Sequence, residues 1–161
     1  MAGDAQAEGG PVRPLTALAF ATAGFVALLI FGLGMVSLAT GEAVIAEPGL
    51  GQVPGIVGTI LATAAFAAGL WVAVRRRPAS YWGSAWTAAA CFLAYVAGVW
   101  FGAVATGTDA AVAAAVSGRI ATSWFGAVVA AAGFIAAWSG VALVRTRAHR
   151  PRWPWEDEFD E

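Results

Sequence analysis

The stretch that decides the fold is the uncharged run at residues 14–41, PLTALAFATAGFVALLIFGLGMVSLATG. Three further runs, 48–74, 78–108 and 120–144, also contain no charged residue. About 20 apolar residues suffice for a helix to cross a hydrocarbon core of about 30 Å. The runs are continuously apolar, whereas outer-membrane strands alternate apolar and polar residues. We therefore predict an all-α polytopic membrane protein, a four-helix transmembrane bundle with helices at about 15–39, 54–74, 80–105 and 119–144.

The composition also excludes a water-soluble domain. Of the 161 residues, 60% are hydrophobic and 12% are charged, against roughly 45–50% and 25% in typical soluble domains. So few charges cannot cover the surface of a soluble protein of this length. We expect one membrane domain at 14–145, between a disordered N-terminus at 1–13 and a tail at 146–161.

The first apolar run has one alternative interpretation, a cleaved signal peptide, since residues 37–39 read Ser-Leu-Ala like a cleavage site. Signal peptides begin with basic residues and have apolar stretches of about 7–15 residues. Here the leader carries Asp4 and Glu8 with no basic side chain before Arg13, and the apolar run is longer. We therefore expect the first helix to be retained.

The arginines predict the orientation. With four spans, both termini and the connection between the second and third helices lie on one side. That side holds eight of the nine basic residues, and the opposite side holds only Arg119. Basic residues accumulate on the cytoplasmic side of membrane proteins. We expect a plasma-membrane protein with cytoplasmic N- and C-termini, and with the loops 41–53 and 106–118 outside.

Matching segments suggest two tandem helical hairpins. The first and third helices both end in Ala-Thr-Gly, at residues 39–41 and 105–107. The second helix opens with residues 53–59, VPGIVGT, and residues 116–122, VSGRIAT, resemble them. Repeated segments of one orientation occur in membrane proteins built by duplication. The alternative is chance similarity between Ala- and Gly-rich segments.

Small residues form a face on the third helix, which we identify as Ala94, Gly98 and Gly102. Helices associate in lipid where small residues let backbones approach closely. This face packs either against another helix of the same chain or against a second copy in a homo-oligomer. Both alternatives follow from the same spacing.

The central parts of the spans lack ionisable residues, which argues against several functions. Proton-coupled transport and intramembrane catalysis rely on such residues. Ser84, Ser139 and Cys91 have no base within the spans, and the single histidine, His149, lies in the tail. We expect no enzyme activity, no metal, no cofactor and no nucleic-acid partner.

A few charged residues flank the spans on the outer side. Arg119 enters the predicted fourth helix, where a long side chain reaches the interface. It either extends to water, or forms an outer-interface ion pair or lipid headgroup contact together with Glu42, Glu47 and Asp109. The loop offers two carboxylates, which is too few for a calcium site, because calcium prefers about six to eight oxygen ligands.

The tail combines basic, aromatic and acidic residues. Its arginines are expected at an anionic inner leaflet, and its last residues are mostly acidic. The tail is either a disordered end that aids solubility or a docking segment with Trp153, Trp155 and Phe159 as anchors.

In span number, in Ala, Gly and Trp content and in its Arg-Trp-Pro-Trp-acidic tail, the chain resembles small four-span integral membrane proteins of actinobacteria. That resemblance implies no catalytic residues and no cofactor. We expect a non-enzymatic membrane scaffold or accessory subunit, embedded in a bilayer with an anionic inner leaflet and associated with a membrane-protein partner or with itself. The alternative is an oligomeric transporter or channel component without proton-coupling carboxylates.

Overall fold

The computed structural model describes residues 13–45, 47, 49–75 and 81–145, and these residues form five α-helices and no strand. The helices are α1 (Pro14–Thr40), α2 (Val53–Arg75), α3 (Trp82–Ala105), α4 (Ala110–Thr122) and α5 (Trp124–Arg145). All except α4 are long and apolar enough to cross a membrane. The prediction of an all-α protein with four membrane-length helices is confirmed.

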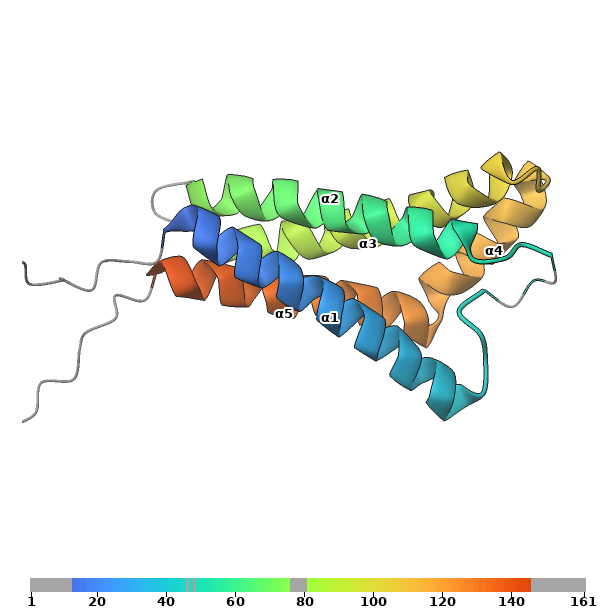
Figure 1. Ribbon diagram of the computed structural model, residues 1–161, viewed down its shortest axis with the longest axis horizontal. Coiled ribbons are helices and arrows are strands. Elements are labelled where there is room, and N and C mark those ends of the chain that lie inside the picture. The colour runs from blue at the N-terminus through green and yellow to red at the C-terminus, as the bar shows by residue number, and fades with distance from the viewer. Residues whose placement is uncertain (1–12, 46, 48, 76–80, 146–161) are drawn as a thin grey trace, which may run out of the picture.

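The four long helices run side by side, and α4 lies at one end of the bundle (Figure 1). The contact between α2 and α3 is the most extensive, followed by those of α5 with α1 and with α3. We call the end that carries Arg13, Arg75 and Arg145 the basic end, and the opposite end the α4 end. The connection between α1 and α2 lies at the α4 end.

The predicted fourth helix is wrong at its start. Residues 119–122 belong to the separate helix α4, and the membrane-length helix begins at Trp124. The break is at Ser123, whose backbone is extended with φ −99° and ψ 175°. Its hydroxyl donates to the carbonyl of Ile120 (3.0 Å), and its own carbonyl accepts from the N–H of Ala127 (3.3 Å). Ser123 thus ends one helix and begins the next, a role that serine favours because its side chain bonds nearby backbone.

The two predicted hairpins are similar at the ends of α1 and α3 but differ at the segments 53–59 and 116–122. Gly41 after α1 and Gly107 after α3 both have positive φ, 69° and 87°, although α1 ends at Thr40 and α3 one position earlier in its segment, at Ala105. Residues 53–59 open α2, but residues 116–122 close α4 instead of opening α5. The second pair of segments therefore does not occupy equivalent positions. The duplication itself stays a prediction.

The seam between α2 and α3 forms at glycines. A Cβ atom on Gly98 would lie 2.6 Å from the Cα of Gly58, and one on Gly102 would lie 2.7 Å from the Cα of Pro54. Gly98 and Gly102 are buried and Ala94 is half-buried. The predicted face thus packs within the chain at its two glycines, which are occupied by α2 and not available to a second copy.

Helix α1 joins the bundle through a narrow stripe. Its buried residues recur every four positions, Ala17, Ala21, Phe25 and Leu29. The Phe25 ring stacks on Phe66 of α2, with centroids 4.6 Å apart and planes 2° from parallel. No α1 residue after Leu29 is fully buried, and the second half of α1 diverges from α2 (Figure 1).

We predict that Gly98→Ala destabilises the bundle, because the new methyl group meets the α2 backbone, which cannot rotate away as a side chain can. Overpacking of this kind costs about 1–3 kcal/mol. Thermal unfolding in mild detergent, followed by circular dichroism, measures the effect. Gly34→Ala is the matched control, since a Cβ at Gly34 meets nothing within 4 Å and alanine favours helix. Equal unfolding temperatures for the two variants would contradict the proposed contact.

Candidate functional site

The predicted outer-interface residue Asp109 caps a helix. Its carboxylate accepts hydrogen bonds from the N–H groups of Ala111 (2.8 Å) and Val112 (3.4 Å) at the start of α4. The indole Nε1 of Trp100 donates to the carbonyl of Ala110 (3.3 Å), which ties the same turn to α3. Aspartate is a preferred N-cap because it satisfies backbone donors that the helix leaves free. Asp109 therefore has a structural partner in the backbone.

The other three outer-interface residues stay apart. Arg119 lies exposed on α4, and Glu42 and Glu47 lie exposed in the connection between α1 and α2. Over residues 13–45, 47, 49–75 and 81–145, Arg119 forms no ion pair with either glutamate or with Asp109. No metal-binding group of three ligating side chains occurs in the same ranges. The contact of Arg119 with a lipid headgroup stays a prediction.

Arginines and aromatic rings pair at the basic end. The guanidinium of Arg75 lies 4.3 Å from the ring centroid of Trp71, and that of Arg145 lies 4.6 Å from the ring of Tyr81. Tyr81 also stacks on Trp138 of α5, with centroids 5.8 Å apart. Cation–π pairs and interfacial aromatic rings are typical where a helix leaves the bilayer. The predicted tail anchors Trp153, Trp155 and Phe159 lie outside the described residues.

An apolar groove runs along α2 and α3 near the basic end. It has a volume of about 760 Å³. Its floor contains the small residues Ala65, Ala68 and Gly69, and two tryptophans stand beside it, Trp82 and Trp86, with 77% and 74% of their surface exposed. We call this surface the tryptophan groove. It joins small residues and large exposed aromatic rings on one side of the chain.

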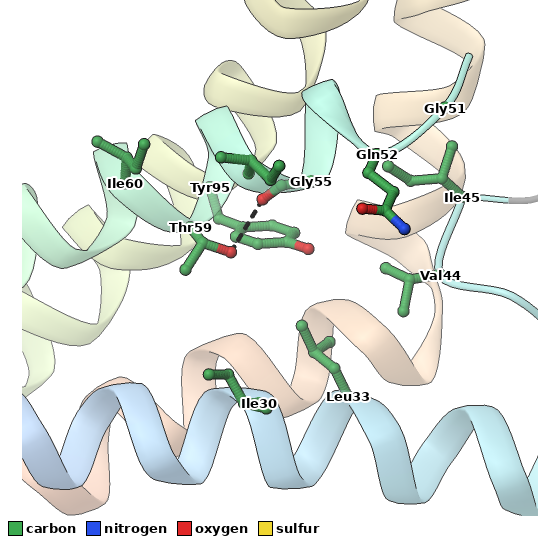
Figure 2. A pocket seen from close by; sticks show the side chains of 11 residues that line it. Ile30, Leu33, Val44, Ile45, Gly51, Gln52, Gly55, Thr59, Ile60 and Tyr95 are labelled. Atoms are coloured by element: carbon green, nitrogen blue, oxygen red, sulfur yellow. Dashed lines mark hydrogen bonds between the residues drawn. The ribbon is translucent and has the colours of Figure 1, made fainter.

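A cavity of about 500 Å³ lies between α1 and α2 towards the α4 end. Figure 2 shows aliphatic side chains from both helices and from the connection between them around this space. They are Ile30 and Leu33 of α1, Val44 and Ile45 of the connection, and Ile56 and Ile60 of α2. The divergence of α1 from α2 after Leu29 opens the cavity. We call it the Tyr95 cavity after the α3 residue at its base.

Tyr95 is the buried polar side chain of this cavity. Only 1% of its surface is exposed, and its hydroxyl points into the space towards Gln52 (Figure 2). No group in the described part of the chain forms a hydrogen bond with that hydroxyl. The neighbouring hydroxyl of Thr59 donates to the carbonyl of Gly55 (2.9 Å). A buried tyrosine hydroxyl usually has a partner, so this one is available for a ligand.

Tyr95 is not among the candidate residues predicted from the sequence. A signal was present, because Tyr95 is a hydroxyl-bearing aromatic residue in the middle of an apolar span, away from both interfaces. Tyrosines in membrane helices concentrate at the interfaces. Its position in the middle of the span therefore identifies Tyr95 as a candidate functional residue.

The sequence matches a family of unknown function, DUF6121, over residues 14–161. This match covers most of the chain. The chain belongs to the DUF6121 family. No curated protein and no solved structure matches it. Membership in DUF6121 therefore adds no assigned activity to the geometry described above.

We predict that Asp109→Ala destabilises α4 in this DUF6121 protein by about 1 kcal/mol, the usual cost of losing an N-cap. Asp109→Asn should retain the stability, because asparagine caps as well as aspartate but carries no charge. The rate of hydrogen exchange at the α4 amides distinguishes Asp109→Ala from Asp109→Asn. Comparable loss of protection in both variants would show that the charge of Asp109 matters, as an ion pair requires.

Proposed function

We propose that the protein is a non-enzymatic integral membrane scaffold or accessory subunit. The observation that carries this proposal is how the hydroxyl groups within the helices are bonded. Five hydroxyls in or next to the helices donate to carbonyls of the preceding turn, in the pairs Thr59 to Gly55, Thr63 to Thr59, Thr87 to Gly83, Thr122 to Gly118 and Ser123 to Ile120. These are the hydroxyls that a water-filled path would use.

Apolar side chains fill most of the space between the helices. Large fully buried side chains come from all four long helices, among them Phe25, Phe66, Val99 and Val129. Transport across a bilayer needs polar groups that replace the hydration of a polar solute. A packed apolar interior supports a structural role over the transporter or channel alternative.

The tryptophan groove is the surface that we propose for a partner. Small residues such as Ala65 and Ala68 let a neighbouring helix come close, which is the main source of helix affinity in lipid. Trp82 and Trp86 then provide large apolar area beside that contact, and tryptophan is enriched where interfaces are strongest. We propose a transmembrane helix of another membrane protein as the occupant.

We propose further that the protein resides in a plasma membrane with the basic end in the cytoplasm. Arg13, Arg75 and Arg145 lie at the basic end, whereas Arg119 is on α4 at the opposite end. This distribution is the one expected from the excess of basic residues on the cytoplasmic side. The tail would then extend into the cytoplasm, where Trp153, Trp155 and Phe159 would provide a second contact with the partner.

We predict that Ala68→Leu reduces recovery of the partner by about tenfold, since overpacking a helix contact costs about 1–3 kcal/mol. The measurement is quantitative co-purification of the full-length protein from native membranes in mild detergent. Ala131→Leu is the matched control, because Ala131 is an exposed alanine on α5 and does not line the groove.

Both variants should show wild-type unfolding temperatures, since the two alanines are exposed. Recovery of the same proteins in the same amounts with Ala68→Leu would overturn the groove as the partner surface. Truncation after Arg152 tests the tail in the same assay. Solute flux into vesicles that contain only the purified protein would overturn the scaffold function itself.

A further inference from the structure

We propose that the Tyr95 cavity binds a lipid-soluble molecule whose carbonyl oxygen accepts a hydrogen bond from the Tyr95 hydroxyl. This goes beyond the scaffold function, which uses the tryptophan groove near the basic end. The Tyr95 cavity lies towards the α4 end. Two observations carry this inference: a cavity of about 500 Å³, and the hydroxyl of the buried residue Tyr95, which points into that cavity and has no hydrogen-bond partner among the described residues.

The route into the cavity lies within the bilayer. Ile30 of α1 and Ile56 and Ile60 of α2 line the cavity and are 64%, 54% and 60% exposed. They form an apolar rim on the surface that membrane lipid would contact. A ligand that passes between them must be soluble in hydrocarbon.

The cavity favours a molecule with a single polar acceptor. Its walls are mostly isoleucine, leucine and valine side chains, which offer no hydrogen bonds. Within the described walls, the Thr59 hydroxyl already donates its proton to Gly55, and Gln52 stands exposed at the mouth. A carbonyl oxygen satisfies the Tyr95 hydroxyl and brings no further donor that would need its own partner.

The size of the cavity suits part of a lipid molecule or a small apolar compound, since ligand sites usually measure about 300–1,000 Å³. Carbonyl groups reach a membrane cavity from two sources. One is a free lipid-soluble ketone or quinone, and the other is the ester group of a phospholipid. The chemistry at Tyr95 is the same for both.

The test compares two probes in the purified full-length protein, namely an alkyl benzoquinone and an alkylbenzene with the same chain but no carbonyl. Dissociation constants come from titration followed by native mass spectrometry. The wild-type protein should bind the quinone roughly 2- to 10-fold more tightly than the alkylbenzene, the usual effect of one neutral hydrogen bond. Tyr95→Phe should abolish that preference and keep the affinity for the alkylbenzene.

Unfolding temperatures exclude a folding defect in Tyr95→Phe. Without ligand the variant should unfold at about the same temperature as the wild type, because no hydrogen bond of the hydroxyl that it loses is found among the described residues.

Gly55→Leu places a side chain in the cavity and should weaken both probes, since a Cβ there already approaches Ile45 to 3.5 Å. Gly34→Leu is the matched control on α1, where a Cβ meets open space.

A second pair of probes, titrated in the same way, is phosphatidylglycerol and its ether analogue, which lacks the ester carbonyls. A preference for the ester that Tyr95→Phe abolishes assigns the site to membrane phospholipid. A preference confined to the quinone assigns it to a free carbonyl compound. Equal binding of each pair by the wild type, or a preference that survives in Tyr95→Phe, overturns the proposal.

Discussion

The backbone contact between α2 and α3 is the constraint on which the rest of the bundle depends. Lipid tails are as apolar as the helices, so only close packing holds helices together. At Gly58 and Gly98 the two backbones meet without intervening side chains. The missing Cβ at Gly58 also leaves room for Tyr95, whose Cδ2 lies 3.4 Å from where that atom would be. The same seam therefore fixes both the bundle and the position of the Tyr95 ring.

Helix α1 then determines where the bundle is open. Its stripe of buried residues follows a spacing of four and ends at Leu29. Further along, Gly32 lies against α5, since a Cβ there would come 2.5 Å from Cγ1 of Val128. The second half of α1 thus follows α5 and leaves α2. The residues of the α1–α2 connection, Val44 and Ile45, cover part of the resulting space without filling it.

The sequence predicted the helical spans well, because the distribution of charge reflects the cost of placing ions in hydrocarbon. The prediction of an outer loop at 106–118 is wrong from residue 110 onwards, because α4 (Ala110–Thr122) occupies that part of the chain. The alanine content of residues 110–118 favours helix, and Asp109 stands at the cap position. The seam residues Gly98 and Gly102 were identified, but their partner helix was not. The spacing of small residues shows which face of a helix can be approached closely. Which helix packs against that face depends on the arrangement of all the helices.

Three buried residues, Ser84, Ser117 and Tyr95, carry a hydroxyl without a hydrogen-bond partner among the described residues, and their surroundings differ. Ser84 and Ser117 have buried oxygens without hydrogen-bond partners in the described residues, and neither lines the tryptophan groove or the Tyr95 cavity. Tyr95 is also a buried residue, but its hydroxyl faces a cavity with an exposed apolar rim. An unsatisfied group in a packed core only costs stability, whereas the same group beside an accessible cavity lets a ligand recover that cost on binding.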